Sequence, residues 1–144
     1  MEKGDEVTIN VEATVQTPVD KVWEYWTEPR HITKWSSASD DWHAPKAEND
    51  LRVGGKFLTR MEAKDGSFGF DFGGVYDEVR KNEFISYTME DGRKVAITFM
   101  SQQDGTKVVE AFEAETTNSI DMQQAGWQAI LDHFKKYCEA PKKD

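Results

Sequence analysis

The 144-residue sequence contains a single cysteine, Cys138, only four prolines and no long apolar segment. One cysteine cannot form an internal disulfide, which is typical of a protein in a reducing compartment. A membrane-spanning helix needs about 20 consecutive apolar residues, and the first residues, MEKGDEV, lack the apolar centre of a signal peptide. We therefore expect a cytoplasmic protein without a membrane segment.

Basic residues are scarce as well. Lys and Arg number 18 against 27 Asp and Glu, which gives a formal net charge of -9 and an isoelectric point near 4.8. Nucleic-acid phosphates and anionic lipid surfaces repel such a chain. We expect no nucleic-acid partner and no membrane partner.

Catalytic and metal-binding motifs are missing too. The sequence has no glycine-rich phosphate loop, no G-x-S-x-G motif and no Cys/His metal spacing. His43 follows Asp40, Asp41 and Trp42, and two interpretations are open: a metal or proton-transfer site, or an ordinary exposed histidine, which we favour. His133 and Cys138 are interpreted as structural residues. We assign no catalytic residue, no metal and no cofactor.

The chain does contain many aromatic residues, with five Trp, eight Phe and four Tyr. Its length fits one domain with its own core, residues 1–144. Strict alternation over Val7 to Val15 predicts a half-buried strand. Thr17 is a predicted N-cap for a short helix over 18–26, and Pro29 begins a second short helix that ends at Trp35. The polar segment Ser36 to Asp50 is predicted to be a loop.

A run of strands follows that loop. Asp-Gly pairs at 65–66, 91–92 and 104–105 are hairpin turns, so the strands form an antiparallel meander. We count six strands including the first, and a seventh would be hidden where glycine pairs interrupt the pattern at 54–55 or 73–74. The five strand segments after the loop are Leu51 to Met61, Phe68 to Val79, Glu83 to Met89, Lys94 to Ser101 and Thr106 to Thr116.

The last element is the longest helix pattern in the chain, from Ser119 to Tyr137, with Asn118 or Ser119 as N-cap. An antiparallel sheet with one apolar face must bury that face, and only this helix is long enough to cover it. We therefore predict an α+β fold in which the sheet curls around the helix. The apolar stripe expected to face the sheet is Met122, Gly126, Trp127, Ile130, Leu131, Phe134 and Cys138.

Several strings and the order of elements resemble the activator of heat-shock-protein-90 ATPase-like family, within the START-like (SRPBCC, birch-allergen-like) helix-grip superfamily. The resemblance covers about Val7 to Glu139. The strings that carry it are TPVDKVWEYWTEPRHITKW at 17–35, VGGKF at 53–57, FGGVYDEV at 72–79, TKVVEAFEAE at 106–115 and AGWQAILDHFKKY at 125–137. The eukaryotic co-chaperones have a further N-terminal domain with an Asn-rich and Trp-rich motif that these residues do not contain.

The resemblance implies a curved antiparallel sheet that grips the C-terminal helix and leaves a cavity for an apolar molecule. The aromatic residues would otherwise simply fill a core. We expect the cavity at the end where the short helices and the segment between Trp35 and Trp42 lie. The predicted ligand-binding residues are Trp35, Trp42, Phe70, Phe72, Tyr87, Met89, Met122, Gly126 and Ile130.

Glu110 lies between Val108 and Phe112 in the alternation of the last strand. If this face points inward, the carboxyl group is buried and needs a partner, for which Arg60 is one candidate. The alternative, which we favour from sequence, is that the strand turns this position outward.

The leading functional hypothesis is a binding protein for a small apolar ligand, with no established biochemical role. A chaperone-associated protein, as the family name implies, is the first alternative. A cyclase or hydratase-like enzyme that uses a buried Glu110 is the second. Exposed aromatic residues would also support a homodimer.

Overall fold

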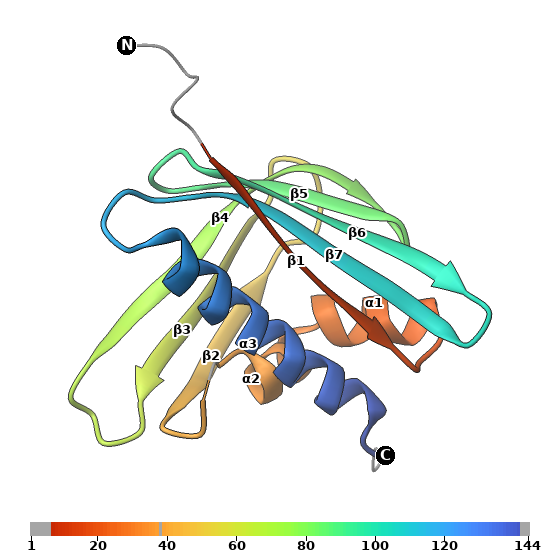
Figure 1. The fold of residues 1–144 in the computed structure, drawn as a ribbon, viewed down its shortest axis with the longest axis horizontal. Coiled ribbons are helices and arrows are strands. Elements are labelled where there is room, and N and C mark those ends of the chain that lie inside the picture. The colour runs from red at the N-terminus through yellow and green to blue at the C-terminus, as the bar shows by residue number, and fades with distance from the viewer. Residues whose placement is uncertain (1–6, 38, 142–144) are drawn as a thin grey trace.

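The computed structural model describes residues 7–37 and 39–141. These residues form seven strands and three helices in the order β, α, α, then six strands, then α (Figure 1). The elements are β1 (Thr8–Val15), α1 (Val19–Thr27), α2 (Pro29–Trp35), β2 (Trp42–Asn49), β3 (Lys56–Ala63), β4 (Gly69–Arg80), β5 (Phe84–Met89), β6 (Lys94–Gln102), β7 (Gly105–Glu113) and α3 (Ile120–Glu139).

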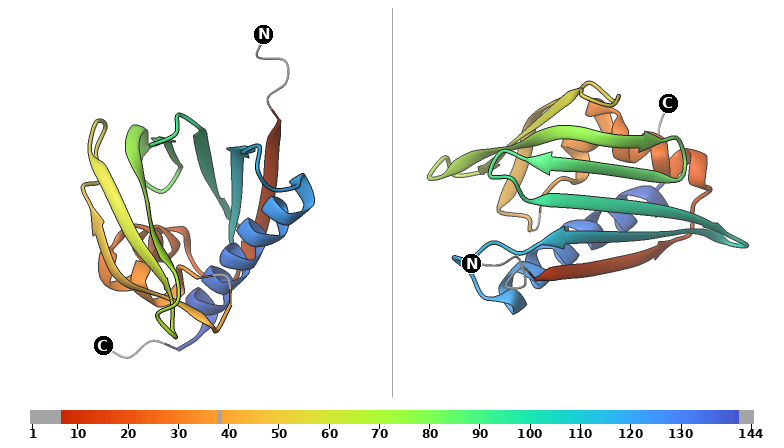
Figure 2. Two further views of the ribbon diagram at one scale, coloured as in Figure 1. Left: turned by 90° about the vertical axis from the view of Figure 1, so that its left-hand side faces the viewer. Right: turned by 90° about the horizontal axis from the view of Figure 1, so that it is seen from above.

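All seven strands belong to one antiparallel sheet with the order β1-β7-β6-β5-β4-β3-β2. The sheet is strongly curved, and α3 crosses its concave side with α1 and α2 beside it (Figure 2). This arrangement confirms the predicted α+β helix-grip fold. The meander from β2 to β7 ends beside β1. The first strand in the sequence therefore pairs with the last one and forms an edge of the sheet.

The seventh strand lies where the sequence indicated a loop. Strand β2 occupies 42–49 within the segment Ser36 to Asp50, and it pairs with β3 through a register shift between His43 and Lys46. The glycine pairs do not hide a strand. Gly54 and Gly55 lie in the turn before β3, where a Cβ on Gly55 would come within 2.0 Å of the Asp50 carbonyl oxygen.

The helix starts were predicted with mixed success. Ser119 is the N-cap of α3, and its hydroxyl accepts a hydrogen bond from the Met122 amide at 3.1 Å. Pro29 is the first residue of α2, as expected. Thr17 does not cap α1, because Pro18 occupies the cap position. The buried Thr17 hydroxyl instead donates to the Cys138 carbonyl oxygen at 3.2 Å and ties the start of α1 to the end of α3.

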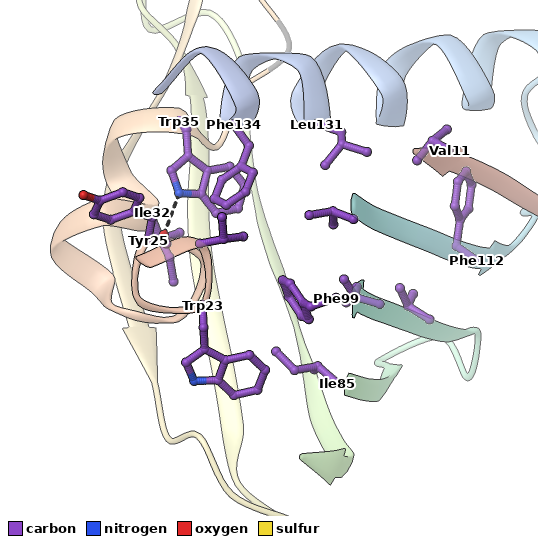
Figure 3. Close-up of a cluster of buried hydrophobic side chains, with 14 of the residues drawn as sticks. Val11, Trp23, Tyr25, Ile32, Trp35, Ile85, Phe99, Phe112, Leu131 and Phe134 are labelled. Carbon is purple, nitrogen blue, oxygen red and sulfur yellow. Dashed lines mark hydrogen bonds between the residues drawn. The ribbon is translucent and has the colours of Figure 1, made fainter. Parts of the chain in front are cut away.

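The core lies between the concave face of the sheet and the three helices (Figure 3). Phe134 of α3 is fully buried, and its ring lies edge-on to Trp35 and Trp26 with centroids 4.7 and 4.8 Å apart. The Trp35 indole donates to the Tyr25 carbonyl oxygen at 2.9 Å, which fixes α2 against α1. Aromatic side chains from the two short helices therefore fill the end of the concave face beside the second half of α3.

The first turn of α3 does not face the sheet as the stripe predicted. Met122 is 64% exposed, whereas the neighbouring Gln123 is buried. The Gln123 side-chain amide bonds the backbone at Glu115 and the carbonyl oxygen of Asn118. These hydrogen bonds satisfy backbone groups of the loop before the helix, so the polar residue takes the inward position.

We predict that Phe134→Ala lowers the free energy of unfolding by about 3–5 kcal/mol, since it removes a fully buried ring and leaves a cavity. Met122→Ala, on the exposed side of the same helix, should change it by less than about 0.5 kcal/mol. Urea unfolding of both variants measures the two changes. Losses of equal size would contradict the orientation of α3.

Candidate functional site

A cavity of about 290 Å³ lies between the concave face of the sheet and helices α2 and α3. Its volume is close to the lower end of the range for small-ligand sites. Its walls are mostly apolar and come from the three helices and from strands β2, β3, β4, β5 and β7. The lining residues are Trp26, Ile32, Trp35, Ser36, Glu48, Phe57, Thr59, Met61, Phe70, Phe72, Tyr76, Ile85, Tyr87, Arg93, Glu110, Trp127 and Ile130.

Five of the nine predicted ligand-binding residues lie in this lining: Trp35, Phe70, Phe72, Tyr87 and Ile130. The other four lie outside it. Met122 faces outward, and Gly126 has no atom within 4 Å of the position that a Cβ would take, so its lack of a side chain relieves no clash. Met89 is buried further along β5, opposite Gly74. Contact of any of the nine with a ligand stays a prediction.

Phe68 and Phe70 lie next to the β3–β4 turn, and Phe70 shares the inward face of Phe72, opposite the buried Met61. Phe68 and Phe70 are 63% and 42% exposed, and both rings pack against Trp42 with centroids 5.9 Å away. We call Trp42, Phe68 and Phe70 the rim cluster. Because Phe70 also lines the cavity, apolar surface continues from the exterior of the protein into the cavity.

Trp127 of α3 forms a second wall of the cavity. Its ring is stacked on Phe112 of β7, with centroids 3.9 Å apart and an interplanar angle of 10°. Its edge meets Phe72 of β4 at 6.1 Å. The indole therefore bridges two distant strands across the concave face, and its position fixes the distance between α3 and the middle of the sheet.

Sequence reasoning missed several lining residues on β3 and at its neighbours. Thr59 and Met61 are buried on the same face as Phe57, so the period of two identifies them once the inward face is known. Tyr76 is buried in the core, and its hydroxyl donates to Asn49 at 2.5 Å. Asn49 in turn donates to the Thr27 carbonyl oxygen at 2.6 Å. This relay links the cavity wall to α1, and no local pattern indicates it.

Glu110 faces inward, so the outward orientation favoured from sequence is wrong. Only 6% of the residue is exposed, and its cross-strand neighbours Val11 and Ile97 are buried aliphatic residues. Burial raises the pKa of the Glu110 carboxyl group from 4.5 to about 8. Among the described residues, no hydrogen bond or ion pair to this carboxyl group is found. At neutral pH it is therefore mostly protonated.

Arg60 is not the partner of Glu110. Its guanidinium group bonds Glu62 at 2.9 Å and Asp71 at 3.3 Å, on the outer face of the sheet. Arg93 is the arginine that lines the cavity, and it bonds Asp91 at 2.8 Å and the Glu113 carbonyl oxygen at 3.2 Å. Arg93 is thereby held at the edge of the cavity.

The histidines take separate places. His43 is exposed on β2 with its Nε2 3.9 Å from Glu62, and His133 bonds the Ser37 carbonyl oxygen at 3.0 Å. His31 is buried and bonds the Tyr137 hydroxyl at 2.6 Å. With Glu24 and Glu28 it forms the one group of three potential metal ligands among the described residues.

Arg30 already occupies the region of those two carboxylates. Its guanidinium group lies 2.9 Å from Glu28 and 3.2 Å from Glu24. The two carboxylates therefore already have a cationic partner in Arg30. Burial and the Arg30 charge lower the pKa of His31. We interpret this group as a structural ion-pair network between α1 and α2.

Comparison with known proteins places the chain in a family. The family model described as "Activator of Hsp90 ATPase homolog 1-like protein" matches residues 16–139. The chain belongs to this family. The search of curated proteins found no match.

Solved structures of similar proteins agree with this fold. The AHSA1-like protein from Aeromonas hydrophila is 46% identical, with 92% of each chain covered and a TM-score of 0.88. A solution structure from Cytophaga hutchinsonii is 54% identical over 93% of this chain and 92% of the other, with a TM-score of 0.77. A protein of unknown function from Staphylococcus aureus shares the fold at 16% identity, 94% coverage of each chain and a TM-score of 0.75.

None of the three helices in the described ranges combines the length and hydropathy needed to cross a membrane.

We predict that Glu110→Gln stabilises this family member increasingly as pH rises. The folded state holds the Glu110 proton with a raised pKa, so its contribution is complete below pH 4.5 and is lost as pH rises through about 8. The variant cannot lose a proton, and its advantage should grow between these values to roughly 4–5 kcal/mol.

Urea unfolding at pH 5, 7 and 9 tests this dependence. Glu12→Gln, at an exposed carboxylate of β1, is the matched control and should show no such trend. A constant difference between wild type and Glu110→Gln across the three pH values would contradict burial of the carboxyl group.

Proposed function

We propose that this protein binds a small, mainly apolar molecule in the cavity beside α3. The observation that carries the proposal is the cavity of about 290 Å³, which side chains of the two short helices, the long helix and the sheet leave unfilled. Small-molecule sites in proteins are concave, mainly apolar and carry a few polar groups, and this cavity has all three features. A ligand there would contact apolar side chains of the helices and of the sheet.

The rim cluster supports the same proposal. Exposed aromatic side chains that gather at one place commonly mark a binding surface. Here they continue into the lining through Phe70, so an apolar molecule would remain in contact with apolar surface as it enters. We propose that this binding takes place in the cytoplasm.

The family description gives the alternative, action with a chaperone of the Hsp90 type. It rests on that description alone, whereas ligand binding rests on the cavity. Measurement of chaperone ATPase turnover with and without the protein separates the two. A stimulation that persists when the cavity is blocked would favour the alternative.

We predict that Ile130→Trp weakens binding of an apolar fluorescent probe such as N-phenyl-1-naphthylamine at least tenfold. Ile130 lines the cavity from α3, and the larger indole would occupy part of its volume. Met122→Trp adds the same side chain to the exposed side of the same helix and should leave binding unchanged. Titration of the probe fluorescence gives both dissociation constants.

Native mass spectrometry of the purified wild-type protein is the companion measurement. A co-purifying small molecule that is absent from Ile130→Trp would support the proposal. Equal probe binding by wild type and Ile130→Trp, with both variants folded by circular dichroism, would contradict it.

A further inference from the structure

Two hydroxyl-bearing groups face the cavity without a protein partner. Glu110 of β7 and Tyr87 of β5 are both only 6% exposed. Both line the cavity. Among the contacts of the described residues, neither the Glu110 carboxyl group nor the Tyr87 hydroxyl has a hydrogen bond. Their polar atoms are open to the cavity and are therefore available to a bound molecule.

The surroundings of Glu110 make it a hydrogen-bond donor. Strands β1 and β6 place Val11 and Ile97 opposite it, and α3 contributes Trp127 and Ile130 to the same cavity. Burial among these groups raises its pKa to about 8, so the neutral acid predominates at pH 7. A neutral carboxylic acid in an apolar site can donate its O–H to an acceptor oxygen.

Tyr87 is a donor over the same pH range. Burial, and then the Glu110 charge, raise the pKa of its hydroxyl well above the ordinary value. On the intervening strand β6, Tyr87 lies opposite Val95 and Glu110 lies opposite Ile97, two residues further on, so both side chains lie on the concave face of the sheet. The remaining titratable or charged groups of the lining are Tyr76, Glu48 and Arg93. Tyr76 is engaged with Asn49, and the pKa of Tyr76 is also raised by burial.

We propose that the ligand is an uncharged, mainly apolar molecule with one carbonyl-type acceptor oxygen, which the Glu110 carboxyl group and the Tyr87 hydroxyl bind. This inference rests on the proposed function, that the cavity takes an apolar molecule. It specifies the polar group that such a molecule carries and the end of the cavity at which that group lies.

Charge disfavours the other ligand classes. A cationic amine would lie in the same cavity as the Arg93 guanidinium group, in an environment that already stabilises the uncharged form of Glu110. An anion would meet Glu48 in a protein of net charge -9, and the apolar surroundings that keep Glu110 neutral also disfavour a buried anion. A carbonyl oxygen needs only donors, and a site with unpaired buried donors discriminates against an analogue that lacks the acceptor.

Three probes of nearly the same shape test the proposal: benzophenone, diphenylmethane and diphenylmethylamine. They differ at the carbon that joins the two phenyl rings, which carries a carbonyl oxygen, two hydrogens or a protonated amino group, respectively. Dissociation constants come from titrations followed by protein amide NMR shifts. At pH 6.5 we expect benzophenone to bind about tenfold more tightly than diphenylmethane, as one or two buried hydrogen bonds provide.

The pH dependence of the preference for benzophenone, and its change in Glu110 variants, identify the group that binds the carbonyl oxygen. The preference for benzophenone should fall at pH 9.5, where Glu110 is ionised, while diphenylmethane binding changes little. Glu110→Met should remove most of the preference, and Glu110→Gln should retain it without the pH dependence, because its amide donates at every pH. Glu12→Gln, at an exposed carboxylate of β1 outside the cavity, is the matched control and should behave as wild type.

Each outcome is decisive. If benzophenone and diphenylmethane bind equally, the proposed carbonyl class is overturned while apolar binding stands. If the amine binds most tightly, the carboxylate form of Glu110 is the recognising group and the proposal is wrong. If none of the three binds to the folded wild type, the proposed function itself is overturned. Should Glu110→Met fail to fold, the pH independence of Glu110→Gln carries the test.

Discussion

The structure depends on one constraint: a single long helix has to cover the concave face of seven strands. Helix α3 covers the part near β1 and β7, where Trp127 stacks on Phe112 and the Gln128 side chain bonds the Glu12 carbonyl oxygen of the edge strand. The short helices fill one end with Trp26 and Trp35. The space between these two contacts, in front of the middle strands, is the cavity. It follows from the topology rather than from a gap in any one element.

Most of the fold could be predicted because its strands carry a local signal. Alternation over Val7 to Val15 and the Asp-Gly turns determine a meander with one inward face. Strand β2 carries no such signal. It contains Pro45 and charged residues, it lies at the edge of the sheet, and of its residues only Ala44 is buried. Its conformation is set by pairing with β3, which a local reading of the sequence does not reveal.

Sequence periodicity places some residues of the cavity lining on the correct face, but it does not show where the cavity ends. Periodicity identifies the face on which a residue lies, so Phe72 and Tyr87 were placed correctly on the concave side. It does not tell where along an element the cavity stops. Met89 shares a face with Tyr87 but lies beyond the cavity, and Met122 is displaced from the inward position by the hydrogen bonds of Gln123.

Glu110 shows what the cavity requires of the sequence. The stability of a domain is about 5–15 kcal/mol, and a carboxyl group buried among aliphatic residues lowers it by a large part of that range at neutral pH. Its neighbours on the same face, Val108 and Phe112, are fully buried apolar residues, so the strand itself has no structural need for an acid there. Departures from a local rule without a structural gain concentrate at functional sites. The position at which β7 departs from its apolar alternation opens into the cavity, and the proposed recognition of a polar atom on a bound molecule would account for both facts.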